Sequence, residues 1–143
     1  MYFISIKIKH ALISALLFFI SYNTSFAQTS KEDPIVHAVN GIWADSNSTA
    51  FTNGYAIFTV DAHGKLVVTH YVEFNGRPMV EKGIGFCTHH TISYDVFVTK
   101  AIPGWSQTGQ HVLTLSEDGN TLRGYYKDSK GNQGPLVFKK LYK

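Results

Sequence analysis

The chain has 143 residues, of which 44% are hydrophobic, 14% aromatic and 16% charged, and its formal net charge is +3. This composition excludes a disordered tail and a fibrous repeat, and the length suits a single domain. Eight Tyr, ten Phe and two Trp favour β-strands over a helical bundle. No motif in the sequence fixes a biochemical activity by itself.

Residues 1–27 have the pattern of a cleaved export signal. A basic start with Lys7 and Lys9 precedes an apolar run over 11–20, and small side chains occupy the two positions that signal peptidase reads. Cleavage is expected after Ala27. A membrane anchor needs about 20 apolar residues, which this run does not reach, so no transmembrane anchor is expected to remain. The protein is therefore expected in the periplasm or outside the cell.

The remaining chain, residues 28–143, is nearly neutral. Without Lys7 and Lys9, 11 basic residues stand against 10 acidic ones, which gives a net charge of +1. The only dense basic cluster is that of Lys139, Lys140 and Lys143. Because nucleic-acid binding normally requires a clustered basic surface, no nucleic-acid partner is expected.

Cys87 is the only cysteine, so an exported chain has no internal disulfide available to it. Free cysteine is among the most frequently buried residue types, and no C-x-x-C spacing is present. These observations favour a small buried side chain over a reactive thiol.

The chain after the signal divides into a polar lead-in and one β-domain. Residues 28–38 show no periodicity and are expected to be a flexible segment, and residues 39–143 are expected to form the domain. Eight short alternating runs are separated by Gly-, Asn- and Asp-rich turns. They cover residues 39–46, 54–61, 65–74, 79–87, 91–101, 110–115, 121–127 and 135–142.

The short connections predict antiparallel pairing, because parallel strands need crossovers of a dozen or more residues. Asn75-Gly76 is the strongest turn signal, since both central positions of a type I′ turn require positive φ. Closing the eight strands into an up-and-down barrel removes the exposed edges. A β-sandwich would give the same period and stays as the alternative fold. In the third run, the set that should point inward comprises Leu66, Val68, His70, Val72 and Phe74.

The first run resembles the start of the calycin superfamily, the lipocalin and avidin-like barrels. The resemblance lies in Gly41-Ile42-Trp43, which matches the G-x-W pattern of that superfamily. It implies a small secreted barrel in which a basic residue of the last strand packs over the Trp. Lys139 or Lys140 stands in the matching place, and a cation over an indole face would contribute on the order of 0.5 to 2 kcal/mol.

Several polar and aromatic side chains are expected to line the interior. His70 lies in mid-strand on the apolar face, where an imidazole needs a partner. His111 shares a face with Leu113 and Leu115, so it could approach His70 within the barrel. An apolar pocket with a few polar groups is typical of a small-molecule site, and the alternative is a filled core. The candidate ligand-binding residues are His70, Tyr94, His111, Tyr126 and Phe58.

The sequence gives little support for metal or enzyme chemistry. No His-x-His pair is present, and the adjacent His89 and His90 would point in opposite directions on a strand. G-x-S-x-G and Ser-x-x-Lys arrangements are also absent from the sequence. No cofactor, metal or catalytic residue is therefore assigned, and a metal-assisted or hydrolytic enzyme is the weakest of three hypotheses.

Two binding functions are preferred to the enzyme hypothesis. The first is an exported protein that holds a small hydrophobic or amphipathic ligand in its barrel. The second is an envelope protein-binding or inhibitor module that acts through its loops. Trp105 motivates this alternative, because a Trp in the Gly/Pro-rich loop 102–107 could anchor an interface. The same side chain could instead fold back over the barrel mouth.

Overall fold

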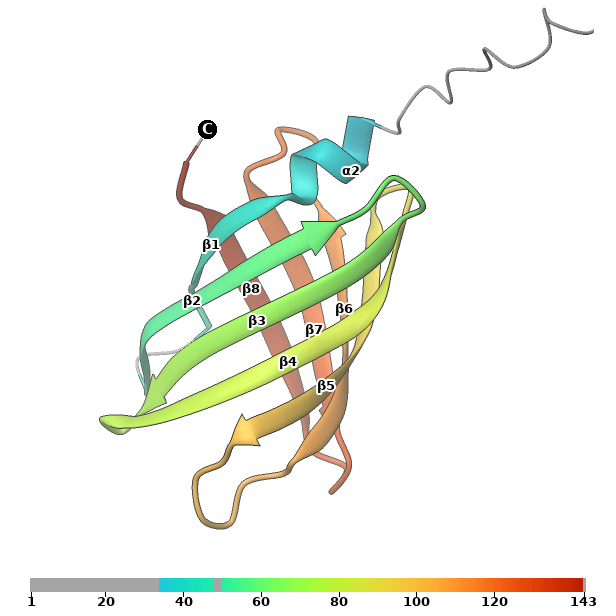
Figure 1. Cartoon of the computed structure of the whole chain (residues 1–143). Helices are drawn as coiled ribbons and strands as arrows, with labels where there is room; N and C mark the ends of the chain where they lie inside the picture. Colours follow the sequence, from blue (N-terminus) through green and yellow to red (C-terminus); the bar gives the residue numbers. More distant parts are fainter. Residues whose placement is uncertain (1–33, 48–49, 143) are drawn as a thin grey trace, which may run out of the picture. The chain divides into compact units, whose positions relative to one another are not determined.

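The computed structural model describes residues 34–47 and 50–142, so the predicted export signal lies outside the described part of the chain. The described part contains one short helix and eight strands (Figure 1). Their bounds are α2 Pro34–Val39, β1 Gly41–Asp45, β2 Phe51–Val60, β3 Lys65–Phe74, β4 Arg77–Thr88, β5 Thr91–Lys100, β6 Thr108–Leu115, β7 Thr121–Asp128 and β8 Gln133–Lys140.

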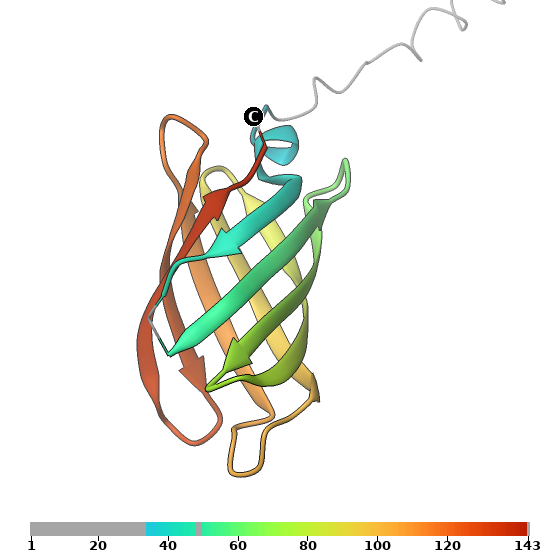
Figure 2. The ribbon, with the colours of Figure 1, turned by 90° about the vertical axis from the view of Figure 1, so that its left-hand side faces the viewer.

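The strands form a closed antiparallel barrel in sequence order. Each strand pairs with the next, and β1 pairs with β8 through Trp43 opposite Lys140 and Asp45 opposite Phe138 (Figures 1 and 2). Closure satisfies the backbone groups that an edge strand would leave unpaired. The predicted up-and-down barrel is confirmed, and the sandwich alternative is wrong.

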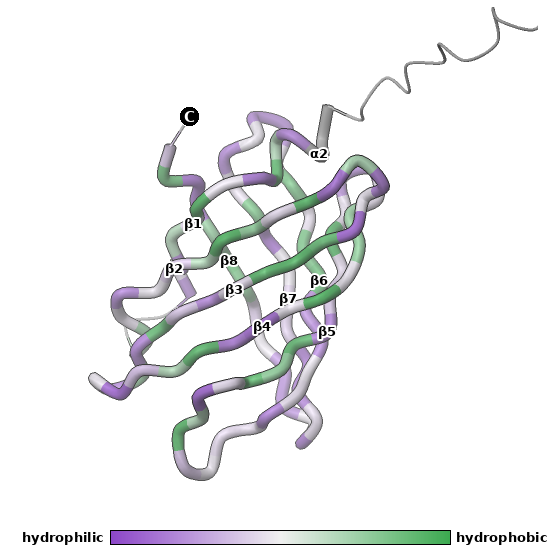
Figure 3. Tube along the Cα trace, viewed as in Figure 1, coloured by the Kyte–Doolittle hydropathy of each residue, from purple (hydrophilic) through white to green (hydrophobic). Residues whose placement is uncertain are grey.

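Local sequence explains the regular wall of the barrel. Buried and exposed residues alternate along β3, with Leu66, Val68 and His70 on the inner face as predicted. Asn75 and Gly76 have φ values of 49° and 73°, which confirms a tight turn with two left-handed residues between β3 and β4. Figure 3 shows hydrophilic residues at this turn and at the turn between β2 and β3.

The structure differs from expectation at the start of the domain. Residues 34–38 were expected to be part of a flexible segment and Val39 to begin a strand, but Pro34–Val39 form α2 and β1 begins at Gly41. Gly41 has a φ of 138°, a value that suits glycine where the chain turns from helix to strand. Six residues are too few to show a helical period in the sequence. Within the described residues, no helix has the length and apolar character needed to span a membrane.

The end of the barrel next to α2 is filled. Val39 is fully buried in the main core, and the indole N–H of Trp43 donates to its carbonyl oxygen at 2.9 Å. Lys140 Nζ donates to the Ala38 carbonyl oxygen at 2.6 Å and lies 5.3 Å from the centroid of the Trp43 ring. Of the two lysines expected over Trp43, Lys140 takes this place, whereas Lys139 is exposed on the outer face.

Candidate functional site

A cavity of about 590 Å³ is lined in part by the β5–β6 loop, which lies at the end of the barrel opposite α2 (Figure 1). Its rim is formed by the loop between β5 and β6, residues 101–107, and by the turn between β7 and β8, residues 129–132. Apolar side chains make up much of its wall. They are Phe51, Val72, Met79, Val96, Val98, Trp105 and Leu136.

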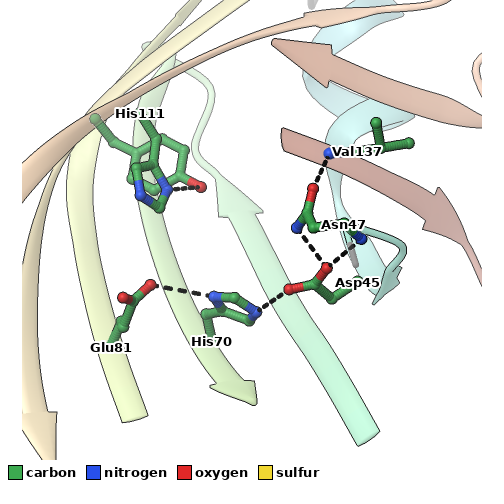
Figure 4. Close-up of polar contacts among 7 residues, drawn as sticks. Asp45, Asn47, His70, Glu81, His111 and Val137 are labelled. Atoms are coloured by element: carbon green, nitrogen blue, oxygen red, sulfur yellow. Dashed lines mark hydrogen bonds and ion pairs between the residues drawn. The ribbon is translucent and has the colours of Figure 1, made fainter. Parts of the chain in front are cut away.

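A buried chain of three ionisable residues lies on the cavity wall. His70 on β3 points between two carboxylates, with Nε2 3.1 Å from Asp45 Oδ2 and Nδ1 3.2 Å from Glu81 Oε2 (Figure 4). The side chains of His70, Asp45 and Glu81 are only 8%, 4% and 11% exposed. Three polar groups inside an apolar barrel are tolerated because they pair with one another.

The charge of His70 follows from these contacts. Burial by itself lowers the pKa of His70, but the hydrogen bonds to Asp45 and then Glu81, with their negative charges, outweigh it and raise the pKa to about 9. His70 is therefore an imidazolium at neutral pH and donates both ring N–H groups. Two carboxylates around one imidazolium leave one net negative charge at the cavity wall.

Asn47 fixes the position of Asp45. Both the backbone N–H of Asn47, at 2.9 Å, and its side-chain amide donate to Asp45 Oδ1. The amide oxygen of Asn47 accepts the backbone N–H of Val137 on β8 (Figure 4). Both oxygens of Asp45 are therefore occupied, one by His70 and one by Asn47.

His111 on β6 is held by Tyr94 on β5. Their hydrogen bond joins His111 Nδ1 and the Tyr94 hydroxyl at 3.0 Å, and the two residues are directly opposite in the strand register. Burial lowers the pKa of His111 to about 4 and outweighs the opposing effect of the Glu81 charge, so His111 is neutral. Burial also raises the pKa of Tyr94. Because a phenol is the better donor and an imidazole nitrogen the better acceptor, Tyr94 donates to Nδ1 and Nε2 carries the proton of His111.

Glu81 Oε1, His111 Nε2 and Tyr126 Oη are among the polar atoms of the cavity wall that have no partner within the described residues. No fully enclosed side-chain nitrogen or oxygen within the described ranges lacks a hydrogen bond. These three atoms are therefore reached from the cavity. They supply an anionic acceptor, a neutral N–H donor and a hydroxyl.

The rim is held together by contacts between its two loops. Lys130 Nζ donates to the Gly104 carbonyl oxygen at 2.6 Å, and the hydroxyls of Ser106 and Ser129 lie 2.9 Å apart. Trp105 is half-buried, and its ring lies 5.0 Å from that of Phe74 and 5.9 Å from that of Phe51. The β5–β6 loop thus lies against the ends of β2 and β3, with Trp105 facing the cavity.

The structure brings together only some of the residues singled out from the sequence. His70, His111 and Tyr126 line the cavity. Tyr94 holds His111 through their hydrogen bond. Phe58 lies in the filled core, with its ring 6.0 Å from that of Tyr94. Strand alternation shows which face a residue takes but not how far along the barrel axis it lies, so it could not separate these two groups.

Sequence reasoning missed Asp45 and Glu81 as functional residues. A signal for Glu81 existed, because the two-residue turn at Asn75-Gly76 sets the register of β3 and β4 and places Glu81 opposite His70. Asp45 had no comparable local signal, since its contact with His70 reaches from β1 to β3 across β2 and no short turn sets the register of these two strands.

Within the described part of the chain, no group of three or more His, Cys, Asp and Glu side chains could hold a metal ion. His89 and His90 are exposed in the turn between β4 and β5. No family model matches the sequence, and no curated protein matches it.

Proposed function

We propose that this protein is a non-enzymatic binding protein that holds one small amphipathic molecule in the open half of its barrel. The observation that carries this proposal is the cavity itself. It has a largely apolar wall and polar atoms, among them Glu81 Oε1, His111 Nε2 and Tyr126 Oη, that have no partner within the described residues. Small-molecule sites usually combine a largely apolar concave surface with a few fixed polar groups that orient the ligand.

The size and position of the cavity support the same function. Its volume of about 590 Å³ lies within the usual range of roughly 300 to 1,000 Å³ for ligand pockets. The opposite half of the barrel is packed by Trp43, Phe58 and Phe138, which form edge-to-face ring contacts. This packed half gives a rigid floor, so a ligand would enter and leave at the end of the β5–β6 loop.

The proposal includes export and a relationship to the calycin barrels. The basic and apolar pattern of residues 1–27 supports delivery to the periplasm or the outside of the cell. The contact of Lys140 with Trp43 supports the calycin resemblance because it joins the G-x-W position to the last strand. A secreted barrel of this kind would act as a carrier or a receptor for its ligand.

Fluorescence of the neutral apolar dye N-phenyl-1-naphthylamine tests this function. We expect saturable binding with one dye per protein, because the cavity accepts one molecule of this size. Val98 lines the cavity, and Val98→Phe should weaken the binding by filling it. Val67→Phe, on the outer face of β3 where the side chain is 46% exposed, is the matched control. Absence of saturable binding to the wild-type protein would contradict the proposal.

A second candidate function, binding of a protein partner, is favoured by the outer surface of the barrel. Large apolar side chains are exposed on the outside of neighbouring strands β1 to β5. They are Ile42, Tyr55, Ile57, Val67, Tyr71, Ile84, Phe86 and Phe97. Exposed apolar patches often mark interaction sites.

Capture from an envelope extract tests this candidate with wild-type, Phe86→Ser and Trp105→Ala protein. A partner lost only with Phe86→Ser would support binding through the outer wall, and one lost only with Trp105→Ala would support binding through the loop. Capture of nothing specific by the wild-type protein would contradict this second function.

A further inference from the structure

We infer that the ligand of this cavity carries a primary ammonium group, and that Glu81 Oε1 accepts a hydrogen bond from it. This inference rests on the proposed function and adds the chemical class of the ligand. It depends on which polar atoms of the wall are occupied, on where the charges lie, and on how the apolar surface is distributed.

The two carboxylates of the wall differ in whether they can accept a further hydrogen bond. Asp45 accepts hydrogen bonds on both oxygens, from His70 and from Asn47. Glu81 accepts one, on Oε2, from His70. Its other oxygen has no partner among the described residues, although the Glu81 side chain is only 11% exposed. A buried carboxylate oxygen that is open to a cavity requires a donor from the ligand or from water.

The positive charge of the wall is turned away from a ligand. Both ring nitrogens of His70 face carboxylates, at 3.1 and 3.2 Å. A ligand therefore meets the free oxygen of Glu81 and not an imidazolium N–H. The two carboxylates carry more charge than the single imidazolium between them, so the wall has an excess negative charge. A ligand cation would neutralise this excess, whereas a ligand anion would add to it.

The remaining titratable groups of the cavity do not reverse this preference. Lys127, Asp128 and Lys130 lie at the rim, on β7 and in the turn that follows it. Lys130 Nζ donates a hydrogen bond to the Gly104 carbonyl oxygen, and the Asp128 carboxylate accepts one from the side-chain amide of Asn132. Lys127 is exposed to solvent, where its charge is screened.

The neutral groups of the wall suit the rest of such a ligand. His111 Nε2 and Tyr126 Oη face the cavity and can bind a hydroxyl, a carbonyl or a second amine hydrogen. Val72, Met79 and Val98 offer apolar surface between Glu81 and the rim. The ligand class is thus an amine with an apolar chain or ring.

Calorimetric titration at pH 7 with octylamine, octan-1-ol and octanoate tests the inference. The three probes have equal chain lengths and carry a positive, a neutral and a negative head. We expect octylamine to bind about tenfold more tightly than octan-1-ol, the size of effect expected of a charge-assisted hydrogen bond, and octanoate to bind most weakly. Equal or tighter binding of octan-1-ol or octanoate would overturn the inference and leave the proposed function standing. Binding of none of the three would contradict the proposed function itself.

Two further measurements assign the effect to Glu81. Glu81→Gln should bring the ratio of the octylamine and octan-1-ol affinities close to one. Glu117→Gln removes an exposed carboxylate from the turn between β6 and β7, at the opposite end of the barrel, and should leave the ratio unchanged. An unchanged ratio in Glu81→Gln would overturn the assignment.

A measurement on the wild-type protein alone covers the case in which Glu81→Gln does not fold. Octyltrimethylammonium has the positive charge of octylamine but no N–H group. It should therefore bind several-fold more weakly than octylamine. Equal affinities would overturn the hydrogen bond to Glu81 Oε1.

Discussion

His70 and Glu81 are directly opposite each other on β3 and β4, and their side chains meet inside the barrel with Nδ1 and Oε2 3.2 Å apart. The contact is buried, so each side chain depends on the other for compensation of its charge. Asp45 reaches the second nitrogen of the same imidazole from β1. The protonation of His70 is therefore tied to the folded state.

The stability of the protein should fall on the alkaline side because of His70. Its pKa is raised from 6.5 in the unfolded chain to about 9 in the folded one. Its contribution to the free energy of unfolding is then complete below pH 6.5 and is lost as the pH rises to about 9, with a total of about 3 kcal/mol. Urea unfolding at several pH values would measure this decline.

Two variants separate His70 from other groups in that experiment. His70→Gln should remove most of the decline between pH 6.5 and 9. His63→Gln changes an exposed histidine in the turn between β2 and β3 and should retain it. A decline of equal size in wild-type and His70→Gln protein would show that His70 is not the titrating group.

His111 should limit stability on the acid side. Its folded pKa of about 4 lies below the value of 6.5 for the unfolded chain, so the unfolded state takes up the proton first as the pH falls. The free energy of unfolding should therefore decrease from pH 6.5 towards pH 4. His111→Gln should flatten the curve between pH 6.5 and 4.5, measured by the same urea titrations. A slope like that of the wild type would contradict a buried neutral His111.

The two lysines at the end of β8 should differ in their effect on stability. Lys140 donates to the Ala38 carbonyl oxygen of α2 and lies over Trp43, whereas Lys139 is exposed. Lys140→Met should lower the free energy of unfolding by about 1 to 2 kcal/mol. Lys139→Met should change it by no more than about 0.5 kcal/mol. Thermal unfolding of the two variants compares them, and equal melting temperatures would argue against this role of Lys140.

Trp105 should report on the contents of the cavity. It lines the cavity, while the other tryptophan, Trp43, is fully buried in the filled half of the barrel. Addition of octan-1-ol should therefore change the tryptophan emission of the wild-type protein in a saturable way. Trp105→Phe should abolish the change, and a response that persists in this variant would place the ligand elsewhere.

The barrel could be predicted because the sequence patterns that specify its strands and turns lie within short segments of the chain. Period-two alternation places Leu66, Val68 and His70 on one face, and the Asn75-Gly76 turn requires a two-residue hairpin. Helix α2 was not predicted, because its position depends on tertiary contacts of Val39 with the core and of the Ala38 carbonyl oxygen with Lys140.

The cavity was predictable only in part. His111 and Tyr126 could be assigned to the inner face, but Tyr94 and Phe58 have the same alternation and lie deeper, in the packed core. The contact of Asp45 with His70 joins residues 25 positions apart, from β1 to β3 across the intervening strand β2. Such contacts depend on the curvature of the whole sheet, which strand periodicity does not specify.

The most direct test of a ligand site in the open half of the barrel is a methyl NMR titration with octan-1-ol. We predict saturable shifts of the methyl signals of Val72, Met79, Val98 and Leu136, which line the cavity. The signals of Leu66, Ile92 and Leu122, buried in the main core, should stay nearly constant. Shifts confined to methyl groups on the outer wall, or no saturable shift at all, would contradict a ligand-binding cavity in this barrel.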